Sequence, residues 1–386
     1  MSAPRPLSIL LVGDYAEDAR LGSSKVFFKL RDEFTSRGHS CDVVWAHDIG
    51  GWPANRHIRQ LASPWLAGRA LARRMGAKRY DVVDAASAEG LFLGVMNLVA
   101  HVDGHALICR SNGLEHTNYA RMLDDHRHGL LPKPWTRRLW YPATRLTQVA
   151  AAARLADRLI VLNEADRRFA LDRGWQPADR VALIPHGVSQ VFVESAPAPD
   201  APRGAGLLFC GSWAHVKGIA YLAAAMERLH ADGHRWPLTV LGPGVDRVQV
   251  LDSFAPAVRP LVTVIDRAAE TRVIEEYRRH DVLLATSSYE GFGLVVIEAM
   301  SQRLPVIATP AGYAETIVRD GVTGIRIPFR DADALSAAVV ALMTDRCRRR
   351  QLGDAAHDAV AGLTWAATAA QTLAVYESAR AGRTTR

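Results

Sequence analysis

Cysteine is scarce in this sequence. There are four cysteines in 386 residues, and their positions, 41, 109, 210 and 347, show neither close pairs nor the spacing of metal ligands. A disulfide framework is therefore not expected, and the pattern fits buried free thiols in a reducing cytoplasm. The sequence also lacks a histidine–cysteine cluster and a Walker-type lysine loop, so we expect no metal site.

Long hydrophobic runs are missing as well. No apolar stretch approaches the roughly 18 to 20 residues that a membrane-spanning helix needs. The N-terminal segment MSAPRPLSILLVGDY has a short apolar stretch that continues directly into a strand-like pattern, so no signal peptide is expected. With 49% hydrophobic and 23% charged residues, the composition is that of a soluble globular protein. We expect a cytoplasmic protein.

Acidic residues are absent from two segments of the first half. Residues 1–190 account for the whole formal net charge of +7, and residues 53–80 and 126–156 contain no aspartate or glutamate. The second segment also holds Trp135, Trp140 and Tyr141. Basic residues mixed with such aromatics favour peripheral contact with an anionic membrane surface. Two solvated helices with an excess of arginine are the alternative, and nucleic acid is not expected as a partner because no nucleic-acid module accompanies the charge.

Strand-like and helix-like segments alternate along the chain, whose length suits two domains. In the first half the apolar runs are 8–13, 41–46, 80–86, 106–112 and 158–163. After residue 206 the pattern restarts with the runs 206–211, 237–244, 262–266, 282–286 and 305–309. Such alternation is typical of a parallel, doubly wound α/β sheet. The sequence therefore predicts two Rossmann-like domains.

A segment rich in proline, alanine and glycine divides the two halves. Residues 193–206 (VESAPAPDAPRGAG) have the composition of a linker. We therefore expect an N-terminal domain over residues 1–192 and a C-terminal domain over residues 207–362. The tail, residues 363–386, is predicted to be helical.

The most informative stretch covers residues 287–316. A buried strand is predicted before it and a helix from Leu294 onward, so Gly291 and Gly293 lie at a strand-to-helix turn. A ligand can approach such a glycine turn closely, and the helix N-terminus favours an anion such as a diphosphate. Glu290 and Glu298 flank the turn, and carboxylates beside a phosphate site suit the hydroxyl groups of a sugar and a ribose.

This stretch resembles the E-x7-E signature of retaining GT-B glycosyltransferases, in particular of glycosyltransferase family 4. The resemblance continues in residues 305–308, 321–328, FCGSWAHVKGI (209–219), IPHGV (184–188) and the N-terminal LSILLVGDY with the glycine–serine pair that follows it. It implies a GT-B fold, in which two Rossmann-like domains face each other across a cleft. The first domain would bind the acceptor, the second the nucleotide sugar, and the C-terminal helix would return to the first.

For the donor, the resemblance implies that Glu290 binds the sugar hydroxyls, Glu298 the ribose and Lys217 the diphosphate. Glu290 and Lys217 would be the catalytic residues. The other predicted donor contacts are Gly22, Ser23, Gly211, Ser212, Gly242, Arg267, Gly291, Phe292, Gly293 and Leu294. Family members usually carry an arginine near the start of the Lys217 loop, where this chain has Ser212 and Trp213, so Arg267 is the candidate for the second cation.

For the acceptor, the resemblance points to the segment RSNGLEH (110–116). Asn112 stands where family members often have a histidine, and an amide can hydrogen-bond a hydroxyl but cannot titrate. Glu115 and His116 are therefore the candidates for an acid–base role. His186, in the turn 184–188, is predicted to be either structural or a contact to the acceptor.

Together these features predict an enzyme that transfers a hexose from a UDP- or GDP-linked sugar to an acceptor hydroxyl with retention. Glycan, glycolipid or cell-envelope polysaccharide synthesis is the expected setting, with a carbohydrate or lipid-linked acceptor. No cofactor is expected, since Lys217 and a helix dipole can supply the charge stabilisation that a metal gives elsewhere. Two alternatives are a non-catalytic GT-B subunit that binds a sugar nucleotide and a nucleotide-sugar epimerase or hydrolase on the same fold.

Overall fold

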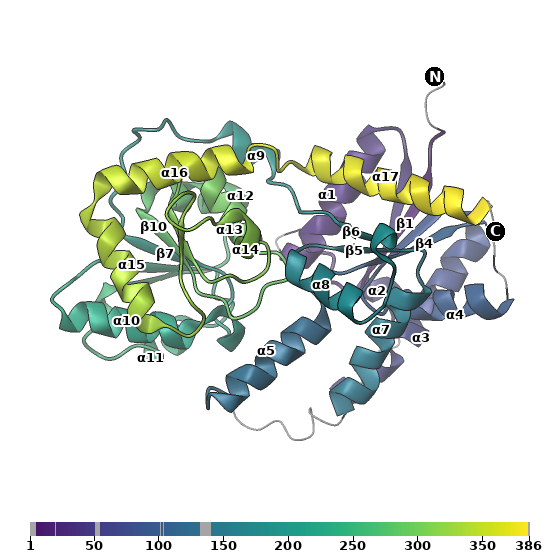
Figure 1. Cartoon of the computed structure of the whole chain (residues 1–386), viewed down its shortest axis with the longest axis horizontal. Coiled ribbons are helices and arrows are strands. Elements are labelled where there is room, and N and C mark those ends of the chain that lie inside the picture. Colours follow the sequence, from purple (N-terminus) through teal and green to yellow (C-terminus); the bar gives the residue numbers. More distant parts are fainter. Residues whose placement is uncertain are drawn as a thin grey trace. The chain divides into compact units, whose positions relative to one another are not determined.

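The computed structural model describes residues 5–19, 21–50, 55–100, 102, 104–131 and 140–384. The chain forms two compact units (Figure 1), one of Met1–His186 with Trp365–Arg386 and one of Gly187–Thr364. In the described residues each unit contains a six-stranded sheet in which every pair of neighbouring strands is parallel. The predicted pair of doubly wound α/β domains is therefore confirmed.

The sheet of the first unit has the order β2-β1-β3-β4-β5-β6. Its central strands are buried along their whole length, as expected for unbroken apolar runs covered by helices on both faces. The strands are β1 Ser8–Val12, β2 Ser40–Val44, β3 Val82–Ala86, β4 Ala106–Arg110, β5 Arg158–Val161 and β6 Val181–Leu183.

Helices cover both faces of this sheet (Figure 1). The helix α1 packs beside α17, while α3, α4 and α7 form a second packed group. A π-helical turn, Pro142–Leu146, leads directly into α7. The helices are α1 Gly22–Ser36, α2 Ala46–Ile49, α3 Arg56–Ala77, α4 Leu91–Ala100, α5 Glu115–Arg127, α7 Thr147–Leu155, α8 Glu164–Asp172 and α17 Trp365–Thr384.

A buried polar group fastens α17 to the first sheet. Asp84 of β3 accepts hydrogen bonds from the guanidinium of Arg110 of β4 (Nη2–Oδ2 2.6 Å) and from the hydroxyl of Tyr376 of α17 (2.5 Å). All three residues are completely buried. Because a buried charge is tolerated only when it is paired and hydrogen-bonded, removing Asp84 or Arg110 leaves the other charge uncompensated, and removing Tyr376 takes one hydrogen bond from the carboxylate.

The sheet of the second unit has the order β12-β11-β10-β7-β8-β9. Its strands are β7 Leu207–Cys210, β8 Leu238–Leu241, β9 Val262–Ile265, β10 Val282–Ala285, β11 Val306–Ala308 and β12 Ile325–Arg326. The helices are α9 Gln190–Glu194, α10 Ile219–Ala231, α11 Arg247–Asp252, α12 Glu270–Arg279, α13 Leu294–Ser301, α14 Ala314–Ile317, α15 Ala332–Thr344 and α16 Arg346–Val360. No helix among the described residues has the length and apolar character to cross a membrane.

The segment predicted as a linker is anchored to the second unit. This segment, residues 193–206, begins inside α9, and its Arg203 makes several hydrogen bonds. The guanidinium of Arg203 donates to four main-chain carbonyl groups at the ends of α12 and α13, those of Tyr277, Arg278, His280 and Gln302. These carbonyls are among the groups that a helix C-terminus leaves without intrahelical partners, so the arginine satisfies them.

Candidate functional site

The predicted donor residues of the second unit lie in the loops that follow β7, β8, β9 and β10 and in the first part of α13, the helix after β10. Since the strands are parallel, these loops share one edge of the sheet, where ligands of open α/β sheets bind. Hydrogen bonds tie the loops together. The N–H of Trp213 donates to the carbonyl of Pro243 (2.7 Å), the N–H of Ser288 donates to the carbonyl of Val216 (2.8 Å), and the Thr286 hydroxyl donates to the carbonyl of Lys217 (2.8 Å).

Lys217 and Glu290 form an ion pair at this edge. The Nζ–Oε1 distance is 2.5 Å, and Ser287 donates its hydroxyl to the same carboxylate oxygen at 2.7 Å. The lysine side chain is 23% exposed and the glutamate side chain 17% exposed. Both groups are thus held in place while remaining within reach of a ligand. The structure brings together the two residues that the sequence predicts to be catalytic, although they are 73 positions apart.

Two glycines with positive φ shape the turns around this pair. Gly218, directly after the lysine, has φ +71, and a Cβ there would collide with the carbonyl of Thr286. Gly293 has φ +96 and caps α13 at its N-terminus. Side chains other than glycine rarely adopt this conformation, so the chain uses glycine at both turns. The result places the positive end of α13 next to the turn that carries Glu290, a setting that favours an anion.

The neighbouring predicted donor residues differ in accessibility. Phe292 is 5% exposed, and its ring stacks on Tyr313 with centroids 4.9 Å apart. Its side chain therefore belongs to the core, and the main chain of the turn, with Gly291 and Leu294, is what a ligand would meet. Glu298 is 7% exposed, one turn into α13. The pKa of Tyr277 is raised by burial first, then by Cys210 and a hydrogen bond with Glu298, so this carboxylate contacts a protonated phenol.

The loop after β7 departs from the family pattern in a way that the structure explains. Trp213 is buried against Phe209 and Phe254, and its indole N–H donates to the hydroxyl of Ser253 (2.9 Å). Gly211 has φ +139, and Ser212 is exposed beside it. The tryptophan thus extends the core at a place where the resemblance leads one to expect a cation.

Arg267 lies against the turn that follows β8. A Cβ on Gly242 would approach its Cγ at 4.0 Å, and one on Gly244 would approach its Nη2 at 3.2 Å. The arginine side chain therefore covers the turn next to the loop of Lys217 and is exposed to solvent. This places a second positive charge at the same sheet edge. The described residues contain no group of three or more histidine, cysteine, aspartate or glutamate side chains that could hold a metal ion.

The first unit has its own polar edge, where β1, β3 and β4 end. Gly22 and Ser23 open α1 there, and within the described residues the N-cap position, Leu21, makes no side-chain hydrogen bond to the amide groups of the first turn. Asn112, after β4, donates its side-chain N–H to the hydroxyl of Tyr15 (3.0 Å). Burial, followed by the charge of Glu89, raises the pKa of Tyr15, which keeps this hydroxyl protonated.

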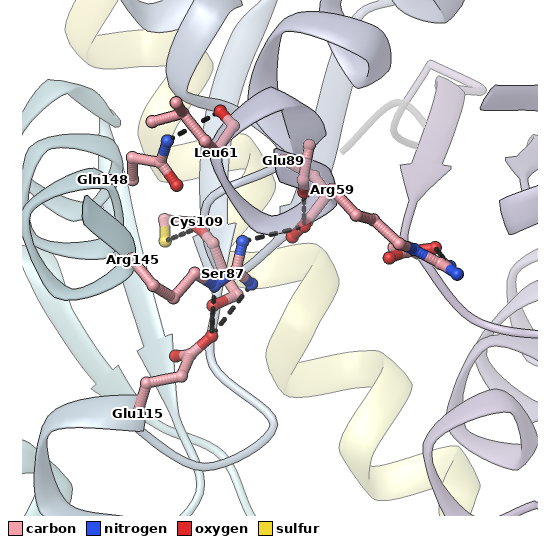
Figure 2. Close-up of polar contacts among 10 residues, drawn as sticks. Arg59, Leu61, Ser87, Glu89, Cys109, Glu115, Arg145 and Gln148 are labelled. Atoms are coloured by element: carbon pink, nitrogen blue, oxygen red, sulfur yellow. Dashed lines mark hydrogen bonds and ion pairs between the residues drawn. The ribbon is translucent and has the colours of Figure 1, made fainter. Parts of the chain in front are cut away.

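Glu115 belongs to an ionic cluster that is shown in Figure 2. Its Oε1 accepts from Arg145 at Nη2 (2.9 Å) and Nε (3.2 Å), and it also accepts a short hydrogen bond from Ser87. The same guanidinium donates to Glu89 through Nη1 (3.3 Å), and Ser63 donates its hydroxyl to that second carboxylate (2.9 Å). Desolvation raises the pKa of Glu89, while Arg145 opposes the rise.

The two predicted histidines lie apart from this cluster. His116 packs its ring against Trp175 (centroids 4.7 Å) and Phe169 (5.4 Å), and burial lowers its pKa to about 4. His186 is 2% exposed and stacks on Trp365, and burial lowers its pKa to about 3. Both rings are therefore neutral at neutral pH and pack in apolar surroundings. The structure brings Asn112 and Glu115 to the polar edge but not these histidines.

Sequence reasoning missed several members of the polar edge. Ser87 and Glu89 each follow a predicted strand within a few residues, which is a signal that could have identified them, whereas Tyr15 lies in the turn after the first strand, which was expected to line the site. Arg145 had no such signal, because it belongs to a basic segment that was assigned to a surface. Its side chain is 14% exposed and is held by two carboxylates, so it does not contribute to an exposed basic face.

Comparison with known proteins fits this geometry. Residues 22–190 match the family described as Glycosyltransferase Family 4, and residues 204–345 match the family described as Glycosyl transferases group 1. D-inositol 3-phosphate glycosyltransferase of Kineococcus radiotolerans is 31% identical over 265 residues, which cover 62% of this chain and 61% of that protein. A protein named D-inositol 3-phosphate glycosyltransferase 1 from Catenulispora acidiphila is 28% identical over 362 residues, which cover 89% of this chain and 82% of that protein. The match spans less than two thirds of the length of several such relatives.

Solved structures show the same fold. Sucrose-phosphate synthase from Thermosynechococcus elongatus superposes with a TM-score of 0.75 at 20% identity, covering 97% of this chain and 99% of that structure. Anabaena HepE in complex with UDP superposes with a TM-score of 0.66 at 16% identity, and the match covers 96% of this chain and 99% of that structure.

The two matched domains and the two parallel sheets define the class of this protein. Its N-terminal domain matches glycosyltransferase family 4 and its C-terminal domain matches glycosyl transferases group 1, on the GT-B fold of the solved structures. The GT-B fold predicted from the sequence is thereby confirmed. The roles of Glu290, Glu298 and Lys217, the retaining outcome and the donor sugar stay predictions.

Proposed function

We propose that the protein transfers a hexosyl group from a nucleoside-diphosphate sugar to an acceptor hydroxyl with retention of configuration. The observation that carries this proposal is the Lys217–Glu290 ion pair beside the N-terminus of α13. A diphosphate in this place meets a fixed cation and the N-terminal end of α13, while the adjacent carboxylate is placed to accept hydrogen bonds from sugar hydroxyls.

The residues divide the reaction between them. As the bond from the anomeric carbon to the phosphate oxygen breaks, its electron pair moves onto the diphosphate, and Lys217 with the α13 amides stabilises this growing charge. Glu290 holds the sugar through its hydroxyls. Retention requires the acceptor oxygen to bond on the face from which the diphosphate leaves. The departing phosphate oxygen then lies next to the acceptor hydroxyl and is placed to take its proton.

No metal cofactor forms part of this proposal. The charge that develops on the diphosphate is met by Lys217, by the positive end of α13 and by Arg267 on the neighbouring turn. Glu298 would take the ribose hydroxyls, since it lies one turn into the same helix. UDP- and GDP-linked hexoses are the donors that we would test first.

The test starts with a panel of nucleotide sugars, screened for thermal stabilisation of the purified chain. The best donor is then incubated with sugar and polyol acceptors, and both donor cleavage and transfer are measured. Stabilisation with transfer to a hydroxyl, lost in Glu290→Gln, is the expected result. Binding without cleavage or transfer would instead identify a non-catalytic subunit, and conversion of the donor to an epimer would identify an epimerase.

The setting of the reaction is part of the proposal: the first unit rests on an anionic membrane and takes a lipid-linked or envelope-associated acceptor. On α3 the side chains of Ile58, Leu61 and Trp65 recur at helical spacing and are 53%, 47% and 61% exposed. Leu98 and Val99 of the neighbouring helix α4 are 64% and 72% exposed. Exposed apolar side chains among basic residues suit the membrane interface, where each lysine or arginine adds on the order of 1 kcal/mol.

Of the second basic segment, Trp140 is 39% exposed, Tyr141 is buried, and Trp135, Arg137 and Arg138 lie outside the described residues.

Liposome co-sedimentation tests the membrane proposal. Pelleting with anionic vesicles should weaken as salt rises, and it should fall in the double variant Leu61→Ala/Trp65→Ala. Val248→Ala, which removes an exposed apolar side chain from the second unit, is the matched control. Equal pelleting with neutral and anionic vesicles would refute the membrane contact.

A further inference from the structure

The ionic cluster of the first unit lies where the acceptor of the proposed reaction would bind. Ser87 and Glu89 follow β3, Glu115 follows β4, and Arg145 reaches them from the π-helical turn before α7 (Figure 2). The carboxyl ends of parallel strands are the usual place for ligands in such sheets. π-helical turns are rare and are frequent at functional sites.

The guanidinium of Arg145 is largely committed to carboxylates. Three of its hydrogen bonds go to Glu115 and Glu89. The side chains are 14% exposed for the arginine, 19% for Glu115 and 4% for Glu89. Because these charges are mostly removed from water, they must neutralise one another locally. An arginine in this state is a poor site for a phosphate, which would have to compete with carboxylates that are already bonded.

The net charge of the cluster is never positive. With both carboxylates ionised it is −1, and protonation of one carboxylate would bring it only to zero; burial raises the pKa of Glu89. The arginine has five N–H groups, so two remain for a ligand. Within the described residues, Oε2 of Glu115 accepts no hydrogen bond, and the buried Oδ1 of Asn112 has no partner. The cluster therefore offers both acceptors and donors, but no excess positive charge.

A hydroxyl group matches this pattern, since it donates one hydrogen bond and accepts others. A phosphate dianion does not, because it can only accept and it brings negative charge next to two carboxylates. We propose that this cluster binds the acceptor through a neutral polyhydroxy ring and discriminates against phosphorylated acceptors. This inference rests on the proposed transferase function. It separates this chain from relatives whose name specifies an inositol 3-phosphate acceptor.

The cluster predicts a gain of phosphate binding when a carboxylate is neutralised. Glu115→Gln keeps the side-chain shape but removes one negative charge, which leaves Glu89 as the single carboxylate partner of Arg145. Inorganic phosphate is the probe, and all proteins carry Lys217→Ala so that the donor site does not bind it. The affinity for phosphate, measured by calorimetry, should rise at least tenfold in Glu115→Gln, and Arg69→Met, which removes an exposed arginine of α3, should change nothing.

Each result decides the question. If Glu115→Gln folds but shows no gain in phosphate affinity, the proposal is overturned. It is also overturned if the unmodified cluster binds phosphate with a submillimolar dissociation constant and this binding is lost in Arg145→Lys. This second comparison does not depend on whether Glu115→Gln folds. Transfer assays then compare myo-inositol and hexoses with their monophosphates, and the neutral member of a pair should be preferred at least tenfold. A preference for the phosphorylated member contradicts the inference. Failure of the transferase function is seen separately, as absence of donor binding and cleavage with Lys217 intact.

Discussion

Replacing Lys217 by alanine tests the donor site most directly. Two unit charges about 4 Å apart interact by roughly 4 kcal/mol at an effective dielectric constant near 20. The lysine shares its charge with Glu290, to which it is bonded at 2.5 Å in the free protein, so its net contribution to a diphosphate is smaller. We expect a loss of about 1.5–3 kcal/mol, the scale of a charge-assisted hydrogen bond. The affinity for a nucleoside diphosphate should therefore fall roughly tenfold to a hundredfold or slightly more.

Calorimetry with the diphosphate and with the bare nucleoside provides the measurement. The nucleoside has no phosphate to meet the lysine, so its affinity should barely change. Arg247→Ala, which removes an exposed cation on α11 of the same unit, serves as the control and should leave both ligands unaffected. Equal losses for nucleoside and diphosphate in Lys217→Ala would show that the lysine acts by shaping the loop and would refute the electrostatic argument.

Four further predictions concern the donor site and the buried His186. Glu290→Gln should abolish transfer with little change in melting temperature, and activity within threefold of the wild type would contradict the role of the carboxylate. Arg267→Ala should weaken diphosphate binding by about threefold to tenfold, less than Lys217→Ala, because exposed charges are screened; an unchanged affinity would leave Lys217 as the cation that matters. EDTA should leave donor binding and transfer unchanged, whereas a loss that is restored by Mg²⁺ or Mn²⁺ would refute the metal-free proposal. Burial lowers the pKa of His186 to about 3. As pH falls below about 6.5, the imidazole is therefore protonated in the unfolded chain but stays neutral in the folded chain. The free energy of unfolding in urea should therefore decrease from pH 6.5 downward, and His186→Phe, which keeps the ring on Trp365, should flatten that slope; an unaltered slope would assign it to other groups.

The donor edge was predictable from sequence because each of its residues is placed by the strand that directly precedes it. Each residue there follows a strand, and parallel strands bring their ends to one edge, so Lys217 and Glu290 could be expected to meet. Glycines before helices marked the turns. Trp213 could not be interpreted in this way, since its burial depends on Ser253 and Phe254, which follow the end of α11.

The acceptor edge was less predictable because it depends on distant partners. Arg145 lies 30 positions from Glu115 and 56 from Glu89, and a π-helical turn aims its side chain. Its charge looked like part of a solvated basic face. His116, next to Glu115 in sequence, turns into an apolar setting with Trp175, which residue spacing alone does not reveal.

The buried Asp84–Arg110–Tyr376 group has a consequence for how the chain is made. The second unit is continuous, whereas the first unit takes its last helix from residues 365–384. During synthesis the ribosome therefore releases the first sheet long before Tyr376 exists, with a charged pair at its centre that lacks its phenol. The domain translated first is completed last, and a premature stop near the end of the message would damage the domain that was read at its beginning.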